Sequence, residues 1–189
     1  MHTASFIGGW GRLSQMMQPY LPLPGAPPAA RIGGREKWNE GRSAREADFF
    51  TVGYAGRQLA QLLDALVAQG VRTLADIRFN AVSMYRPELS KTNLGAAVRA
   101  RGLCYVHLPG LGVPRDIRAG AIATGTRDTI WTWYDRNIAA PYAGRNLHAF
   151  FNGLEHPVAF LCAEADPHEC HRHRLSAALE ANGLRSFDL

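Results

Sequence analysis

Cysteine is scarce in this chain of 189 residues, which contains three: Cys104, Cys162 and Cys170. An odd count in a chain without a recognisable export signal argues against a disulfide framework, so we expect reduced thiols. Each thiol then belongs to a core residue, a ligand or a reactive group. We expect Cys104 to be a core residue, because cysteine is among the residue types most often buried. For Cys162 and Cys170 all three roles stay open.

Long apolar runs are also missing. No stretch approaches the roughly 18 apolar residues that span a bilayer. The chain has 47% hydrophobic and 20% charged residues, an ordinary composition for a globular protein. The first six residues show neither a basic start followed by an apolar stretch nor a small-residue cleavage site. We therefore expect no membrane association and a cytoplasmic location.

Lysine is rare, since 19 of the 21 basic residues are arginine. The net charge is +5, but no run of five like charges marks a basic tail. Arginine suits bidentate recognition of phosphate or carboxylate, although an arginine-rich genome gives the same bias. Charge therefore leaves nucleic acid open as a partner without favouring it.

The composition changes near residue 48. Five of the eleven prolines lie at residues 18–28, and such a stretch holds neither a helix nor a central strand. We interpret residues 1–47 as an irregular N-terminal arm and residues 48–189 as one α/β domain.

Strand and helix patterns alternate after the arm. Short apolar runs predict strands, and apolar residues at helical spacing predict helices. Together they indicate an α/β fold, a single three-layer domain with a mostly parallel sheet. We expect strands at 49–52, 71–77, 103–108, 157–163 and 186–189, and helices at 56–70, 91–101, 129–137, 144–153 and 167–182. Residues 109–126, rich in glycine and proline, are expected to form a long irregular loop.

The segment from Cys162 to Arg172 holds the most chemistry. Asp166 is placed to cap the last helix, with Pro167 at its first position and Glu169 completing a capping box. A helix N-terminus just beyond a buried strand favours an anion or a thiolate. A cysteine, Cys162 or Cys170, followed by His171 and Arg172, provides a nucleophile, a base and an anion-binding group.

Two other strand ends supply polar residues. Gly53 and Tyr54 follow the first strand, and Asp76 and Arg78 end the second. Ligands of parallel sheets bind beyond the carboxyl ends of the strands, so we expect Asp76 and Arg78 to share a cleft with the residues after Cys162. No metal site is expected, because no pair has the short Cys-x2-Cys or His-x3-His spacing of common zinc sites.

Four ordered motifs resemble a known family. They are Thr51-Val52-Gly53-Tyr54, Asp76-Ile77-Arg78, Tyr105 to Gly112, and Cys162-Ala163-Glu164-x-Asp166-Pro167-x-x-Cys170-His171-Arg172. Over about residues 50–189 the chain resembles the bacterial domain of unknown function 488 family. The resemblance implies an architecture and a site but no firmly established activity. Its characteristic polar residues correspond to Tyr54, Asp76, Arg78, His107, Cys162, Glu164, Cys170, His171 and Arg172.

The leading hypothesis is an enzyme for a small anionic substrate, nucleotide- or phosphate-like. Cys162 or Cys170 is the expected nucleophile, His171 the acid or base, and Arg78 or Arg172 the anion-binding residue. Glu164 is grouped with the catalytic residues, and Gly53, Tyr54, Asp76 and His107 with the ligand-binding ones. The alternatives are a nucleic-acid-binding module that uses residues 115–127, and a ligand sensor without catalysis. The sequence assigns no cofactor and no oligomeric state.

Overall fold

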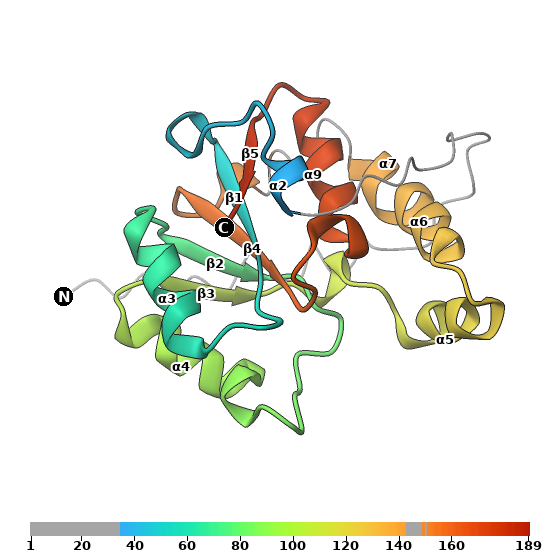
Figure 1. Cartoon of the computed structure of the whole chain (residues 1–189), viewed down its shortest axis with the longest axis horizontal. Helices are drawn as coiled ribbons and strands as arrows, with labels where there is room; N and C mark the ends of the chain where they lie inside the picture. Colours follow the sequence, from blue (N-terminus) through green and yellow to red (C-terminus); the bar gives the residue numbers. More distant parts are fainter. Residues whose placement is uncertain (1–34, 143–148, 150) are drawn as a thin grey trace.

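The computed structural model describes residues 35–142, 149 and 151–189. Five parallel strands form one sheet in the order β3-β2-β4-β1-β5, which confirms the expected α/β class (Figure 1). The strands are β1 (Phe49–Gly53), β2 (Thr73–Asp76), β3 (Cys104–His107), β4 (Val158–Cys162) and β5 (Ser186–Asp188). All five lie within the ranges that the apolar runs predicted, apart from Gly53 at the end of β1.

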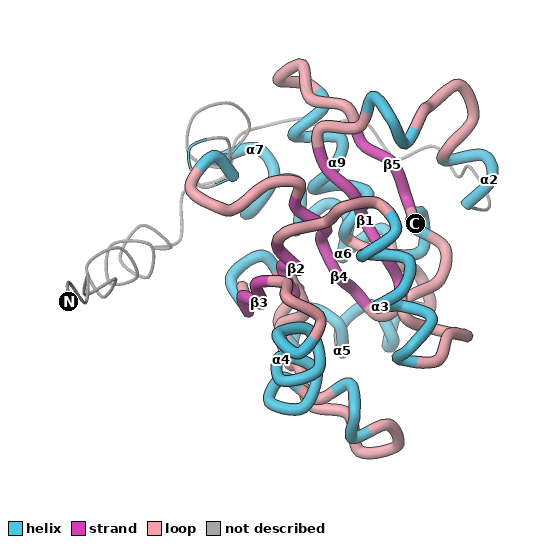
Figure 2. Tube along the Cα trace, turned by 90° about the vertical axis from the view of Figure 1, so that its left-hand side faces the viewer, coloured by secondary structure: helices cyan, strands magenta, loops and turns pink. Residues whose placement is uncertain are grey.

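Helices cover both faces of this sheet (Figure 2). The α-helices are α2 (Arg35–Trp38), α3 (Leu59–Ala68), α4 (Lys91–Ala100), α5 (Arg115–Thr124), α6 (Asp128–Tyr134), α7 (Ala140–Tyr142) and α9 (Arg172–Glu180). Short 3-10 turns occupy Ala44–Glu46, Pro87–Leu89, Pro109–Leu111 and Pro167–Glu169, and a π-helical segment, Asp135–Ala139, joins α6 to α7. The helix expected at 129–137 is thus α6 with its π-helical continuation.

Alternating side chains divide the core into two halves. Phe49 and Phe160 pack on one face of the sheet against α6, α9 and Phe151. Phe50 and Leu161, one residue further along the same strands, pack on the other face against α3 and α4. Successive strand residues point to opposite faces, so each site residue belongs to one half or the other.

The expected loop at 109–126 is corrected by the structure, which has a 3-10 turn and the ten-residue helix α5 there. Pro114 stands at the N-cap and Gly125, with a φ of 67°, ends the helix. Both residues bound a helix rather than a loop. Ala121 is buried, and Ile117 packs against the half of the core that lies between the sheet and α9. Packing against the rest of the domain therefore holds this helix in place.

The last helix begins later than the sequence predicted. Asp166 does cap, but it caps the 3-10 turn, where its carboxylate accepts a hydrogen bond from the His168 amide at 2.9 Å. Cys170 is extended, with φ −131° and ψ 144°, and α9 starts at Arg172. The Glu169 carboxylate pairs with Arg127 at 2.8 Å. Cys170 therefore lies in a kink before the helix and not in its first turn.

Some expectations fall wholly or partly outside the described residues. Most of the helix expected at 144–153 and most of the arm lie outside the described residues. The described end of the arm, 35–47, contacts the domain: the side chain of Asn39 exchanges two hydrogen bonds with the Asp188 backbone, at 2.8 and 3.0 Å. The division of the chain between residues 47 and 48 stays a prediction. Among the described residues, no helix is both long and apolar enough to cross a bilayer.

Candidate functional site

Two thiols and an imidazole meet at the carboxyl end of β4. Cys162 ends the strand, and the turn that follows returns the chain so that Cys170 and His171 face it. His171 Nδ1 lies 3.6 Å from Cys162 Sγ and 3.9 Å from Cys170 Sγ. The three possible ligand atoms all lie within 4.8 Å of one another, and all three residues are buried. We call this group the Cys-His cluster.

The orientation of the His171 ring is fixed by the neighbouring strand. Its Nε2 lies 3.1 Å from the carbonyl oxygen of Ile77, which directly follows β2. A carbonyl oxygen only accepts hydrogen bonds, so Nε2 is the nitrogen that carries the proton. In a neutral ring, Nδ1 then presents a lone pair to both sulfurs.

Glu164 completes this arrangement from the same loop. Its Oε2 lies 3.2 Å from Cys162 Sγ. Burial raises the pKa of the Glu164 carboxyl, but hydrogen bonds from its own amide and from the Cys162 and Cys170 thiols outweigh burial, so the pKa lies below its usual value. Burial instead holds the pKa of the Cys170 thiol well above its usual value. In the absence of other ligands, the carboxylate is ionised and Cys170 is a neutral thiol.

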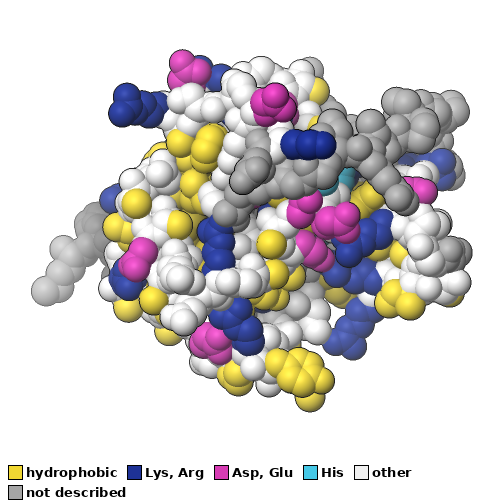
Figure 3. Space-filling view, viewed as in Figure 1, with side chains coloured by type: hydrophobic (Ala, Val, Ile, Leu, Met, Phe, Trp, Pro, Cys, Tyr) yellow, Lys and Arg dark blue, Asp and Glu magenta, His cyan; other side chains and the backbone are white. Residues whose placement is uncertain are grey.

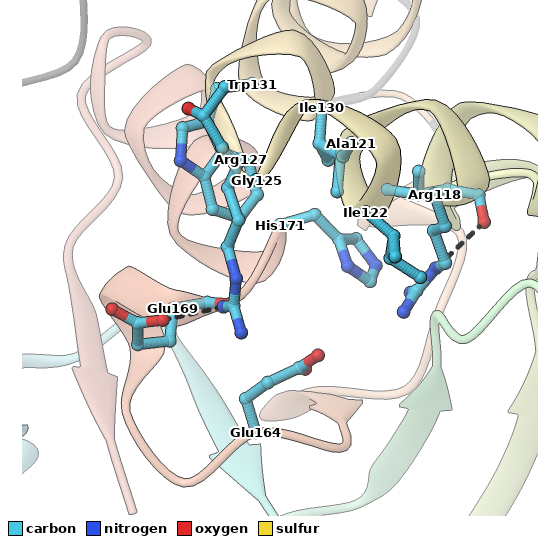
Figure 4. A pocket seen from close by; sticks show the side chains of 12 residues that line it. Arg118, Ala121, Ile122, Gly125, Arg127, Ile130, Trp131, Glu164, Glu169 and His171 are labelled. Carbon is cyan, nitrogen blue, oxygen red and sulfur yellow. Dashed lines mark hydrogen bonds and ion pairs between the residues drawn. The ribbon is translucent and has the colours of Figure 1, made fainter.

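A pocket of about 380 Å³ opens over Glu164 and His171. Its walls come from the segment of α5 and α6, and its floor from the loop between β4 and α9 (Figure 4). Figure 4 shows the Glu164 carboxylate and the His171 ring pointing into this space, between Arg118 and Arg127. The lining residues are Val113, Arg118, Ala121, Ile122, Gly125, Thr126, Arg127, Ile130, Trp131, Glu164, Glu169 and His171.

The two arginines of the pocket differ in their partners. Arg127 pairs with the exposed Glu169 carboxylate at 2.8 Å. Arg118 donates through Nε to the Val113 carbonyl at 3.3 Å, and no carboxylate of the described residues pairs with its guanidinium. An exposed ion pair such as that of Arg127 is worth only about 0–1 kcal/mol, so an anion in the pocket competes with it easily.

Asp76 and Arg78 form a second cluster on the other face of the sheet. The Asp76 carboxylate accepts two bonds from the Arg78 guanidinium, at 2.8 and 2.5 Å, and one from the Tyr105 hydroxyl at 2.7 Å. Arg78 also donates to the Leu89 carbonyl, within the core half of α3 and α4. His107 bonds the Arg78 carbonyl at 2.9 Å, and the Arg78 guanidinium lies over the Tyr54 ring.

The sheet therefore separates residues that the sequence placed in one cleft. Ile77 and Cys162 side chains belong to the core half of α9, whereas Asp76 points to the opposite face with Leu74. Asp76 is fully buried and Arg78 is 4% exposed, so the charge of each side chain is already balanced by the charge of the other. Ligand contact by Tyr54, Asp76, Arg78 or His107 stays a prediction.

Arg172 and Gly53 shape the loop that holds Glu164. The buried Arg172 guanidinium pairs with Asp188 at 3.1 Å and donates to the carbonyl oxygens of Glu164 at 2.5 Å and Ala165 at 2.8 Å. A Cβ on Gly53 would lie 1.7 Å from the Glu164 carbonyl oxygen, so only glycine allows this approach. Neither residue lines the pocket.

Sequence reasoning missed the residues that wall the pocket. Arg118 and Arg127 appeared only within the segment 115–127 of the nucleic-acid alternative, and Trp131 only within the helix expected at 129–137. The spacing of Arg118, Ala121, Ile122 and Gly125 along one helical face was the available signal, and it was lost because the segment was taken as a loop. Cys104, expected in the core, is half-buried on edge strand β3, with its thiol 3.4 Å from Glu155.

Comparison with known proteins gives one match. The family model described as "Domain of unknown function DUF488" matches residues 58–179. The search of curated proteins and the search of solved structures each found no match. The matched region includes the Asp76-Ile77-Arg78 motif and the whole segment from Cys162 to Arg172. Since the match spans more than half of the chain, the chain belongs to the DUF488 family, as its motifs predicted.

Proposed function

We propose that this protein is an enzyme for a small anionic substrate, bound in the pocket over Glu164 and His171. One observation carries the proposal: two arginine side chains, Arg118 and Arg127, flank a pocket whose floor presents a carboxylate and an imidazole. A cationic rim binds phosphate or carboxylate, and acid-base groups beside it serve chemistry on the bound molecule.

The size and lining of the pocket narrow the substrate class. A volume of about 380 Å³ lies at the small end of ligand sites. Trp131 and Ile130 add an apolar wall to the cationic rim. These features favour a phosphate monoester with a planar or apolar part, such as a nucleoside monophosphate, over a bare inorganic ion.

The positions of the side chains change the roles that we propose for several residues. Cys162 and Cys170 do not line the pocket and are 0% and 1% exposed, so direct attack by either thiol is not part of the proposal. Anion binding passes from Arg78 and Arg172, which are buried in ion pairs, to Arg118 and Arg127. Glu164 and His171 keep their proposed place beside the reacting atoms.

The surface gives the nucleic-acid alternative little support. Basic side chains gather on one side of the face in Figure 3, but acidic side chains lie directly beside them. Arg115 and Arg118 share α5 with Asp116, and Asp128 begins α6. A duplex is bound through many phosphate contacts, and alternating charge weakens such binding.

The double substitution Arg118→Ala with Arg127→Ala tests the anion site. We expect nucleoside monophosphates to bind the wild type in isothermal titration calorimetry and to bind the variant at least tenfold more weakly. Two charge-assisted hydrogen bonds are lost, and a tenfold loss corresponds to about 1.4 kcal/mol. Arg99→Ala, an exposed arginine on α4, removes a charge on the other side of the sheet and serves as the control with unchanged affinity.

Turnover decides whether the site is catalytic. Release of inorganic phosphate from the bound monoester, lost in Glu164→Gln while affinity stays within a few-fold of wild type, supports an enzyme. Binding without release of any product indicates a sensor and contradicts the catalytic part. If the wild type and the double variant bind nucleoside monophosphates with equal affinity, the proposed anion site is wrong. The same conclusion follows if the protein retains DNA on filters but does not retain monophosphates.

A further inference from the structure

We propose that the Cys-His cluster is a metal site in which Cys162, Cys170 and His171 bind one Zn²⁺ ion, with a fourth coordination position that faces the pocket. This inference extends the proposed function, because the ion would lie at the floor of the anion pocket. Metal binding is nevertheless measured without substrate, so it holds or fails separately.

The distances within the cluster suit tetrahedral zinc. With bonds of about 2.3 Å to sulfur and 2.05 Å to nitrogen, tetrahedral angles place sulfur and nitrogen about 3.6 Å apart and two sulfurs about 3.8 Å apart. The two distances from His171 Nδ1 to sulfur are 3.6 and 3.9 Å, and the two sulfurs lie within 4.8 Å. The two nitrogen-to-sulfur distances therefore match a tetrahedral zinc ion to within a few tenths of an ångström.

The surroundings of the cluster orient its ligands. A metal-binding histidine commonly donates its second N–H to a carbonyl or carboxylate, and His171 Nε2 does so to Ile77. The Arg172 amide, at the start of α9, donates to Cys170 Sγ at 3.5 Å. An amide in this position donates a hydrogen bond to the sulfur of a metal-bound cysteine and so holds the Cys170 side chain in place as a ligand.

The open side of the cluster faces Glu164. This carboxylate lies 3.2 Å from Cys162 Sγ and lines the pocket with His171, whereas neither sulfur lines it. No basic side chain of the described residues forms an ion pair with the Glu164 carboxylate. A divalent ion would supply the missing positive charge, and Glu164 would lie beside a water or substrate oxygen at the fourth position. Three protein ligands with one open position are typical of catalytic zinc sites.

Zinc is the ion that this donor set favours. Thiolate and imidazole ligands select zinc over magnesium or calcium, which prefer oxygen ligands. The expectation of no metal rested on short spacings along the sequence. Cys162 and Cys170 are eight positions apart, and the intervening turn brings them together without a Cys-x2-Cys motif.

Cobalt substitution tests the site on the full-length chain. After reduction and removal of metals with a chelator, we expect the protein to bind one equivalent of Co²⁺ with a thiolate-to-cobalt charge-transfer band and the visible absorption of a tetrahedral ion. Zn²⁺ should displace the cobalt and remove both signals. Cys162→Ser and Cys170→Ser should each weaken Co²⁺ binding at least about a hundredfold, because losing a ligand exceeds the 10- to 100-fold cost of losing an outer partner.

Cys104→Ser is the matched control, because Cys104 lies on β3 outside the cluster and its loss should leave the cobalt spectrum unchanged. The wild type gives a second readout that needs no variant: Zn²⁺ should raise its midpoint of urea unfolding, and a chelator should reverse the rise. Reduced, folded wild-type protein that takes up no Co²⁺ overturns the proposal. Uptake of Co²⁺ by Cys162→Ser equal to that of the wild type also overturns it. So does a protein that is isolated with a Cys162 to Cys170 disulfide and takes up no metal after that disulfide is reduced.

Discussion

Arg172→Met is expected to lower the free energy of unfolding by about 3–5 kcal/mol, the usual cost of breaking a buried ion pair from one side. Arg172 and Asp188 are both fully buried at their side chains, and the guanidinium also donates to the Glu164 and Ala165 carbonyls. Methionine keeps much of the volume but removes every one of these donors. Urea denaturation followed by circular dichroism measures the loss.

Arg185→Ala is the control for that experiment. Arg185 pairs with Asp48 at 3.2 Å, with 61% and 35% of the two side chains exposed, and such a pair contributes about 0–1 kcal/mol. Adding Asp188→Asn to Arg172→Met should recover part of the stability, because it removes the buried negative charge. A loss of under 1 kcal/mol for Arg172→Met would show that this ion pair does not hold the loop.

Gly53→Ala is expected to lower stability by about 3 kcal/mol and to disrupt the pocket at the same time. The added methyl group would lie 1.7 Å from the Glu164 carbonyl oxygen and 3.0 Å from Arg172 Nη1, so the loop must move. Overpacking of this kind usually costs 1–3 kcal/mol. Because the displaced backbone is that of Glu164, binding of nucleoside monophosphates should weaken together with stability.

Gly120→Ala is the matched control. Nothing lies within 4 Å of a Cβ at Gly120, which is inside α5. Alanine is a better helix former, so this variant should gain about 0.5–1 kcal/mol. Comparable losses from both substitutions would mean that the close approach at Gly53 is not what constrains the site.

The sheet could be predicted from sequence because each buried parallel strand is a short apolar run between polar residues. Phe49, Val158 and their neighbours show this pattern directly. Strand order and register could not be predicted, since they depend on contacts between segments far apart in the chain. Register decides that Asp76 pairs with Leu161, so that Asp76 and Cys162 point to opposite faces.

The site was predicted where one short segment contains it and missed where packing assembles it. Cys162, Glu164, Cys170 and His171 lie within ten residues, so their meeting follows from one turn. Arg118 and Arg127 reach the pocket only because α5 and α6 fold back over that turn. Pro114 and Gly125 were taken as loop residues, although proline before a helix and glycine after it are ordinary boundary signals.

A crystal structure of the reduced protein grown with Zn²⁺ and a nucleoside monophosphate would test the metal site and the anion pocket together. We expect an anomalous zinc peak bonded to Cys162, Cys170 and His171, with the phosphate between Arg118 and Arg127 above Glu164. A phosphate bound elsewhere, or a pocket that stays empty at saturating ligand while the zinc peak is absent from the three ligands, would contradict it.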